Sequence, residues 1–467
     1  MANPPGKAQG GWGAVLLVPA AAICFHIAYF TQWGVFIIGY AVCLVLVARV
    51  LCGRMAFYAG LAAGLLCFAP QLWFFWSLFH LVAVVLWMIL AFWIALFTGL
   101  SSAAFRRLHI MAAVWLIPFL WTGLEYFRSE CYYLRFSWLN IGYAFANSPA
   151  QVPVFPPGVY GWGFLVVLLA VCIVARCWKW LIAAFVVAVI IGAFLPVYSG
   201  LRMRPVKLAV AGVQMEFPTT GEVIANLDKL LAQHPETQVF VLSEYTFSEP
   251  VPAPVADWCR AHGKYLVVGA IDPAPDGNYY DTAFVIGPGG DVVFKQAKSV
   301  PIQFFKDGLP AREQGLWESP WGKIGICICY DLSYTRVTDP LVRMGAQALI
   351  VPTMDVEEWG RHEHALHERV AIARAGEYSI PVFRVASSGI SQLVDGLGIE
   401  SATAPFAGEG ATITGDIAIR GQGTLPLDRY LAPLCVAITA IFIACLIVGR
   451  FFRLAMRMGK PSPSMEI

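Results

Sequence analysis

Charged residues are scarce in this sequence. Only 13% of the 467 residues are Asp, Glu, Lys or Arg, whereas 58% are hydrophobic. With a mean hydropathy of +0.65, this composition lies outside the range of soluble globular domains. It indicates a membrane protein, and no nucleic acid is expected among its partners.

Two features of secreted proteins are also lacking. The first apolar run, 11–32, is preceded by a single basic residue, Lys7, and a second run follows at once, which argues against a cleaved signal peptide. Most of the twelve cysteines, such as Cys24, Cys67 and Cys172, lie inside hydrophobic runs. A cysteine there usually packs as a small apolar side chain, so no disulfide framework is indicated.

Long hydrophobic runs are what the sequence has instead. A helix needs roughly 20 mainly apolar residues to cross about 30 Å of hydrocarbon. Runs that can serve lie at 12–31, 33–51, 56–78, 82–104, 109–127, 159–176, 179–197 and 430–449. The sequence therefore predicts seven membrane helices within residues 1–200 and an eighth within 429–450.

Basic residues mark one side of these predicted helices. They follow the second, fourth, sixth and eighth spans, as Arg49 and Arg54, Arg106 and Arg107, Arg176 and Lys179, and Arg450, Arg453, Arg457 and Lys460. By the positive-inside rule such clusters face the cytoplasm. The polar region 201–428 is then expected on the outer side of the membrane, and 451–467 forms a basic cytoplasmic tail.

The polar region alternates between strand-like and helix-like segments. Strands are predicted at 207–214, 238–242, 265–270, 280–286, 291–297, 323–329, 348–352 and 382–386, where the last closes the series, and helices at 221–233, 339–345 and 364–377. Glycines at 287, 289 and 290 suit the tight turn of a hairpin between the fourth and fifth strands. The pattern predicts an α/β domain large enough for its own core.

Three residues that follow predicted strands form a candidate catalytic set. Cys329 lies in the run Gly325-Ile-Cys-Ile-Cys-Tyr-Asp331, where a strand tip would present its thiol. A thiol is a strong nucleophile as thiolate, and the carboxylate of Glu244 could take its proton. The ammonium of Lys298 could stabilise the oxyanion that forms when a carbonyl is attacked.

Histidines offer a rival arrangement. His362, His364 and His367 follow one another closely, but nothing near them in the sequence resembles a nucleophile. As a zinc site the trio lacks a helical pair four residues apart, so a metal is disfavoured. No cofactor is expected either.

The polar region resembles the nitrilase, or carbon–nitrogen hydrolase, superfamily at the candidate residues. The family's Glu, Lys and Cys occur here in the same order. Gly290 and Lys298 match its hairpin pattern, and Gly325–Asp331 matches its Cys-Tyr-Asp/Glu box. The resemblance implies an αββα sandwich and the following site: catalytic Glu244, Lys298 and Cys329, with Tyr330 and Asp331 supporting the pocket.

The whole chain is similar to the apolipoprotein N-acyltransferase family, which joins such a domain to membrane helices. The similarity includes the stretches 121–128, 136–143 and 158–164 between the predicted fifth and sixth helices. It implies a multi-pass bacterial inner-membrane enzyme that moves an acyl chain from a phospholipid, through a Cys329 thioester, to the α-amine of a diacylated lipoprotein.

Some residues depart from this family's pattern. Ser243 stands where Pro is usual, Asp331 replaces a Glu, and 301–305 lacks the Pro-Phe-Gly-Glu run that supplies a second glutamate. Lys306-Asp307 could substitute only if the loop is rearranged. A membrane-anchored amidase, or an acyltransferase acting on another amine, is therefore the alternative.

Overall fold

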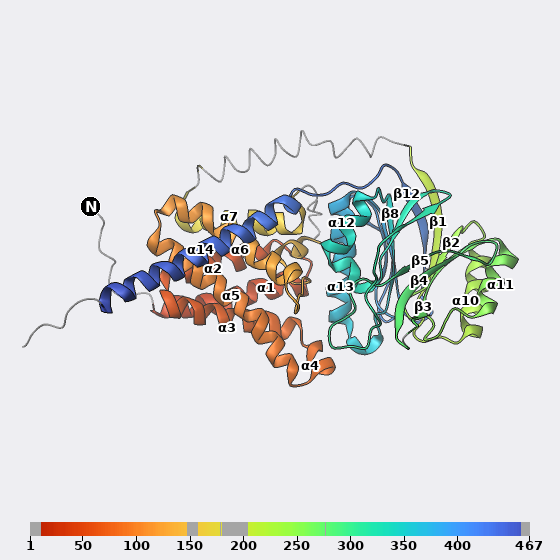
Figure 1. Ribbon diagram of the computed structural model, residues 1–467, viewed down its shortest axis with the longest axis horizontal. Helices are drawn as coiled ribbons and strands as arrows, with labels where there is room; N and C mark the ends of the chain where they lie inside the picture. Colours follow the sequence, from red (N-terminus) through yellow and green to blue (C-terminus); the bar gives the residue numbers. More distant parts are fainter. Residues whose placement is uncertain (1–10, 147–156, 178, 180–203, 276, 459–467) are drawn as a thin grey trace, which may run out of the picture.

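The computed structural model describes residues 11–146, 157–177, 179, 204–275 and 277–458. The predicted span 179–197 lies outside these residues except for its first position, and so does the end of the predicted tail. The described chain forms a bundle of apolar helices beside an α/β domain (Figure 1).

The bundle is built from the predicted hydrophobic runs. Its helices are α1 Gly11–Phe30, α2 Phe36–Val50, α3 Gly53–Gln71, α4 Phe74–Phe79, α5 Val82–Arg107, α6 Ile110–Tyr126, α7 Gly158–Ala175 and α14 Asp428–Met458. Within the described part of the chain, five helices are long and apolar enough to cross a membrane: α3, α5, α6 with the turn after it, α7 and α14. The stretches Val15–Phe30 of α1 and Phe36–Val50 of α2 are also apolar.

The predicted span 56–78 is not one continuous helix. It is divided into α3, which ends at Gln71, and the short helix α4, which begins at Phe74. Pro70 lies in the last turn of α3 and cannot donate a backbone hydrogen bond there, which favours an early end. The break allows α4 to turn toward the α/β domain, where Phe79 contacts Phe305 with ring centres 5.6 Å apart.

Two six-stranded sheets form the centre of the α/β domain. The first has the order β12-β1-β2-β3-β4-β5 and the second β11-β10-β9-β8-β7-β6. Their strands are β1 Val206–Val213, β2 Val239–Val241, β3 Tyr265–Pro273, β4 Tyr279–Ile286, β5 Val292–Ala297, β6 Leu316–Ser319, β7 Gly322–Ile326, β8 Ala348–Thr353, β9 Val382–Ala386, β10 Ser391–Val394, β11 Glu400–Ala404 and β12 Thr412–Ile419.

Helices cover both outer faces of the paired sheets. α10 Thr220–Gln233 and α11 Ala253–His262 lie on the side away from the bundle, while α12 Thr335–Arg343 and α13 Arg361–Tyr378 lie between the sheets and the bundle (Figure 1). This is the expected αββα sandwich, joined to a helical membrane bundle.

The expectation that 382–386 closes the series of strands is wrong. Three more strands follow, and the last of them, β12, pairs antiparallel with β1 at the edge of the first sheet. Its sequence, Thr412-Ile-Thr-Gly-Asp-Ile-Ala-Ile419, carries buried Ile413, Ile417 and Ile419 at alternating positions. The chain thus returns to its first strand before it enters α14.

Helix α13 fixes the α/β domain to the bundle. Arg369 lies on α13, and its guanidinium donates hydrogen bonds to the carbonyl oxygens of Tyr29, at 3.0 Å, and Thr31, at 3.3 Å. These carbonyls belong to the end of α1 and the residue after it, where backbone acceptors lack partners within the helix. The face of the domain that α13 covers is therefore held directly against the apolar helices.

Candidate active site

The nucleophile candidate lies on a sharp turn. The strand β7 ends at Ile326, not at Cys329 as the sequence predicts, and Cys329 begins a 3₁₀ helix, η3 Cys329–Ser333. Its φ of +49° is in the left-handed region, which costs a non-glycine residue free energy and recurs at functional sites. This turn presents the thiol, which is buried, toward the backbone carbonyl of Met354 at 3.8 Å.

The structure brings Glu244 and Lys298 together beside this turn. Glu244 follows β2 and Lys298 follows β5, and Lys298 Nζ lies 2.6 Å from Glu244 Oε1 with both side chains 1% exposed. The other carboxylate oxygen of Glu244 accepts the Met354 amide at 2.7 Å. Gly269 makes room for this arrangement, because a Cβ there would lie 2.6 Å from the Cα of Glu244.

Two further carboxylates lie next to Lys298. Asp307 Oδ2 lies 2.7 Å and Asp281 Oδ2 3.7 Å from Lys298 Nζ. Asp307 is held by Tyr245, whose hydroxyl donates to it at 3.0 Å, and by the Ile302 amide at 2.7 Å. Asp307 is therefore a second carboxylate beside the lysine, and it follows the segment 301–305, which carries no glutamate.

Asp281 is a site residue that the sequence reasoning missed. The hairpin register pairs Thr282 of β4 with Ala297 of β5, and the Lys298 amide donates to the Asp281 carbonyl at 2.8 Å. Pairing the residues of the two predicted hairpin strands outward from the turn would have placed Asp281 opposite Lys298. Its carboxylate is completely buried.

The charges of this cluster determine which groups carry protons. Burial alone would raise the pKa of Glu244, but the Lys298 charge together with hydrogen bonds from Asp281, Lys298 and Cys329 outweighs it and holds that pKa below its usual value of 4.5. Burial and the nearby Glu244 charge raise the pKa of the Cys329 thiol well above 9.0. The pKa of Asp281 is raised well above its usual value, first by burial and then by the Glu244 charge. At neutral pH, Glu244 is thus ionised beside a protonated thiol.

Tyr330 and Asp331 directly follow the nucleophile. Asp331 accepts backbone hydrogen bonds from Ser299 at 3.0 Å, Val300 at 2.7 Å and Ile328 at 3.2 Å. It therefore joins the turn of Cys329 to the segment that follows Lys298. Burial raises the pKa of Asp331 to about 6 despite these bonds.

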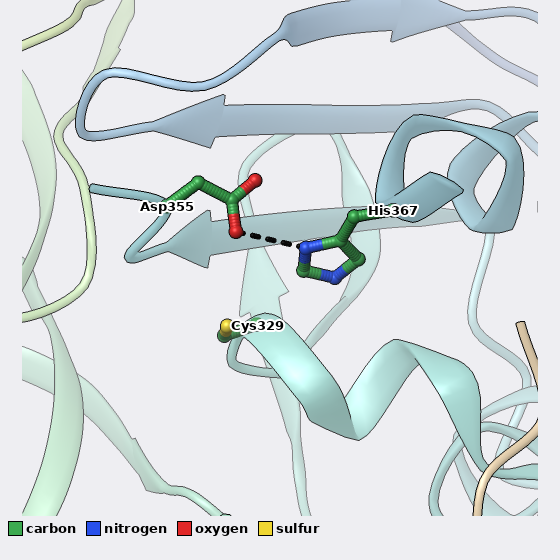
Figure 2. A group of neighbouring side chains, drawn as sticks. All are labelled: Cys329, Asp355 and His367. Carbon is green, nitrogen blue, oxygen red and sulfur yellow. Dashed lines mark hydrogen bonds and ion pairs between the residues drawn. The ribbon is translucent and has the colours of Figure 1, made fainter. Parts of the chain in front are cut away.

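A histidine also lies beside the nucleophile, contrary to expectation. Cys329, Asp355 and His367 have Sγ, a carboxylate oxygen and a ring nitrogen all within 4.8 Å of one another. Figure 2 shows His367 reaching in from α13 toward Asp355, with His367 Nδ1 2.9 Å from Asp355 Oδ1. The sequence could have indicated part of this, because β7 and β8 are parallel and Cys329 and Asp355 follow their carboxyl ends.

The other two histidines have separate contacts. His364 Nδ1 lies 2.9 Å from Glu363 Oε2 and 3.8 Å from Asp355 Oδ2, while His362 Nε2 lies 2.7 Å from Gln71 Oε1 of α3. Asp355, Glu363 and His364 are close enough to share a metal ion. A cation does not suit them, because the Arg384 guanidinium already donates to Asp355 Oδ2.

An apolar cavity opens at Cys329. Besides Cys329, Tyr330 and His367, its walls come from α4 and α5, from the loop 302–305 and from the segment before η2 Ile141–Phe145; they include Phe75, Phe79, Leu86, Leu90, Phe136, Trp138, Ile302 and Phe305. The nucleophile of the α/β domain and side chains of the helical bundle therefore line one space.

Two known families match successive parts of the chain. Apolipoprotein N-acyltransferase N-terminal domain matches residues 19–172, and Carbon-nitrogen hydrolase matches residues 217–422. An apolipoprotein N-acyltransferase of Geobacter metallireducens is 24% identical over 464 residues, which cover 84% of this chain and 87% of that protein.

Other proteins are similar to this chain over shorter stretches. The omega-amidase NIT2-B of Xenopus laevis is 28% identical over 172 residues, 33% of this chain and 62% of that protein. The crystal structure of Saccharomyces cerevisiae Nit3, of the nitrilase superfamily, is 22% identical with a TM-score of 0.40, and the match covers 46% of this chain and 91% of that chain.

Proposed function

We propose that this chain, which belongs to the apolipoprotein N-acyltransferase family, transfers a fatty acyl chain from a phospholipid to the α-amine of an S-diacylglyceryl cysteine on lipoproteins. The observation that carries the proposal is the shared cavity. A buried thiol with its base stands at one end, and aromatic and aliphatic side chains of membrane helices form the walls. Such walls suit an acyl chain that comes from a bilayer.

The first half-reaction forms an acyl thioester. As Cys329 Sγ attacks the ester carbonyl carbon of the phospholipid, its proton passes to Glu244 and the carbonyl oxygen becomes an oxyanion that Lys298 stabilises. The ester C–O bond then breaks, and Glu244 returns the proton to the departing alkoxide. The products are the Cys329 thioester and a lysophospholipid.

The second half-reaction returns the free thiol. The lipoprotein amine attacks the thioester carbonyl, Glu244 takes a proton from the amine nitrogen, and the C–S bond breaks. Glu244 then protonates the departing Cys329 thiolate, so the enzyme ends in its starting state. Asp307 keeps Lys298 charged throughout, since its carboxylate lies 2.7 Å from the ammonium.

The membrane arrangement that fits this chemistry is the inner membrane with the α/β domain on its outer side. Arg49 and Arg106 lie at or near the ends of α2 and α5 that point away from the α/β domain. By the positive-inside rule those ends face the cytoplasm. The site then lies at the outer surface, where a phospholipid and the lipid-anchored acceptor can both reach it.

The test is to detect the thioester and its discharge. Purified protein is incubated with alkyne-tagged phosphatidylethanolamine, and a hydroxylamine-sensitive adduct is expected on the wild type and on Cys327→Ala, but not on Cys329→Ala. Cys327 is the matched control because it is equally buried two residues away. A diacylated lipopeptide should then remove the label and itself become labelled.

The outcome that rejects the proposal is specific. If the thioester forms but only water or a simple amine removes it, the amidase or other-amine alternative replaces lipoprotein N-acylation. If no adduct forms on Cys329 from any phospholipid, a phospholipid is not the acyl donor.

A further inference from the structure

A second, wider groove lies next to the apolar cavity and shares residues with it. Arg135, Ile302 and Phe305 line both spaces. In contrast to the apolar cavity, the groove also exposes Arg312 and Arg336, and its acidic lining in the described part of the chain is Glu313 alone. Positive charge is therefore concentrated where the apolar cavity opens outward.

Arg135 and Arg336 lie near the same tyrosine ring, and neither is in an ion pair within the described residues. Each guanidinium carbon lies 5.6 Å from the centre of the Tyr334 ring. No carboxylate of the described residues forms an ion pair with either, and Arg135 Nε is buried without a hydrogen-bond partner. Burial and, after it, the Arg135 charge lower the pKa of Arg336, against smaller opposing effects of Glu130 and Asp331.

This pair is also close to the nucleophile. Tyr330, the residue after Cys329, donates its hydroxyl hydrogen bond to the Arg135 carbonyl at 3.4 Å, and Tyr334 donates to the same oxygen at 3.3 Å. One tyrosine side chain thus separates the thiol's turn from the backbone of Arg135. In a glycerophospholipid only the glycerol backbone separates the ester carbonyl from the phosphate, so the phosphate of a donor attacked at Cys329 stays near this part of the site.

We propose that Arg135 and Arg336 form a phosphate site that receives the phosphodiester of the acyl donor while its acyl chain enters the apolar cavity. Arginine is suited to this, because its planar fork of donors matches phosphate oxygens. The inference rests on the proposed function and adds that the donor is selected for its phosphate group.

The test compares donors with and without a phosphate. Thioester formation on Cys329 is followed with phosphatidylethanolamine and with p-nitrophenyl palmitate, in the wild type and in the double variant Arg135→Gln/Arg336→Gln. Loss of two charge-assisted contacts should slow acylation by the phospholipid about tenfold or more, and acylation by the p-nitrophenyl ester should change less than about twofold. Arg343→Gln is the matched control, an exposed arginine on the same helix as Arg336.

Each result has a distinct meaning. An equal fall with both donors, or none with either, overturns the phosphate site. Inorganic phosphate is also added to both reactions. If it slows acylation by the p-nitrophenyl ester as much as acylation by the phospholipid, the arginines bind a free anion and not the phosphate of the donor, and the proposal is overturned. Failure of the wild type to take an acyl group from any phospholipid, with p-nitrophenyl palmitate active, rejects the proposed function itself.

His367 carries a second, independent inference. Asp355 is buried but ionised, because the Arg384 guanidinium donates to its Oδ2. Arg384 Nη2 also lies 3.0 Å from His367 Nδ1, but it donates to Asp355 Oδ2. The carboxylate oxygen 2.9 Å from Nδ1 can only accept, so we assign the hydrogen to Nδ1 and the lone pair to Nε2. Nε2 is buried without a partner, and the ring, stacked on Trp138 with centres 4.6 Å apart, lines the apolar cavity with Cys329.

We infer that His367 takes the proton that the acceptor amine must lose before it can attack. An α-amino group has a pKa of about 7.7–8.0 and arrives mainly as ammonium at neutral pH. Transfer of one proton from R–NH₃⁺ to His367 Nε2 gives R–NH₂ and an imidazolium stabilised by Asp355. The amine lone pair then attacks the thioester, and the second proton follows the route through Glu244 to sulfur. After the amide has formed, the His367 imidazolium releases its proton to water, which restores the neutral ring.

A single-turnover assay tests this role. Preformed thioester on His367→Gln should be discharged by a diacylated lipopeptide about 10²-fold more slowly than on the wild type. Formation of the thioester should change less than about twofold, and so should its discharge by hydroxylamine, which is unprotonated at neutral pH. His362→Gln, on the same helix, is the control. Equal slowing of formation and discharge, or unchanged discharge by the lipopeptide, overturns the inference.

Discussion

Lys298 Nζ lies 2.6 Å from Glu244 Oε1 in a position where both side chains are almost completely buried. The lysine is the only cation in contact with Glu244, Asp281 and Asp307 among the described residues. Its charge therefore helps to keep the base Glu244 ionised. It also allows three carboxyl groups to share a buried space.

Replacement of this lysine should destabilise the protein. In Lys298→Met, Glu244 and Asp307 lose their buried counter-charge, and we expect about 3–5 kcal/mol less stability, measured by thermal unfolding in detergent. Lys295→Met is the control, because Lys295 pairs with Asp272 in an exposed position and should cost under about 1 kcal/mol. Equal shifts in both variants would contradict the ion cluster.

The pH dependence of thioester formation should identify the base. In the wild type Glu244 stays ionised down to below pH 4.5 and the Cys329 thiol stays protonated above pH 9.0, so the rate should be flat across neutral pH. It should fall only as acid protonates Glu244. In Glu244→Gln the thiol has no base, so the rate should be low and should rise about tenfold per pH unit with the thiolate fraction. A variant profile as flat as the wild type's would exclude Glu244 as base.

Asp307 should be required for activity through its contact with Lys298. Asp307→Asn removes the negative charge beside Lys298 and weakens the hydrogen bond that holds the loop at Ile302. Acylation should therefore slow at least about tenfold. Asp307→Glu keeps the charge and should recover part of the rate. Asp416→Asn, which affects an exposed pair with Lys207, should leave acylation unchanged. No rescue by the glutamate variant would point to a structural role of the loop alone.

The junction between domain and bundle should depend on Arg369. In Arg369→Gln the carbonyl oxygens of Tyr29 and Thr31 lose a charged donor, and we expect a loss of about 1.5–3 kcal/mol in thermal stability. Arg361→Gln, on the exposed start of the same helix, is the control. If both variants melt at the same temperature as the wild type, the docking of α13 on α1 does not depend on this contact.

Much of the architecture could be predicted because local patterns control it. The hydrophobic runs predict the helices of the bundle, since a membrane-spanning helix satisfies its backbone hydrogen bonds within one segment. Most strands of the α/β domain carry their own apolar pattern, and β4 and β5 are joined by a glycine-rich turn. The order of Glu244, Lys298 and Cys329 matched a known family, and the structure places the three residues together.

The misses have a common cause, which is contact between segments distant in the chain. The strand β12 forms at the edge beside β1, more than 190 residues earlier, so no local signal closes that sheet. His367 lies on a helix whose spacing alone does not show which face meets Cys329. Asp281 and Asp307 reach one lysine from two different segments.

The sequence by itself determined that this chain is a membrane protein with an α/β domain carrying a Cys, a Glu and a Lys after its strands, because composition and periodicity are properties of single segments. Only the tertiary structure decided which charges surround Lys298 and that His367 and Asp355 lie beside the thiol. It also decided that helices of the bundle complete the apolar cavity. These relationships arise where the ends of parallel strands, the β4–β5 hairpin and α13 meet. Packing of the whole chain brings these segments together.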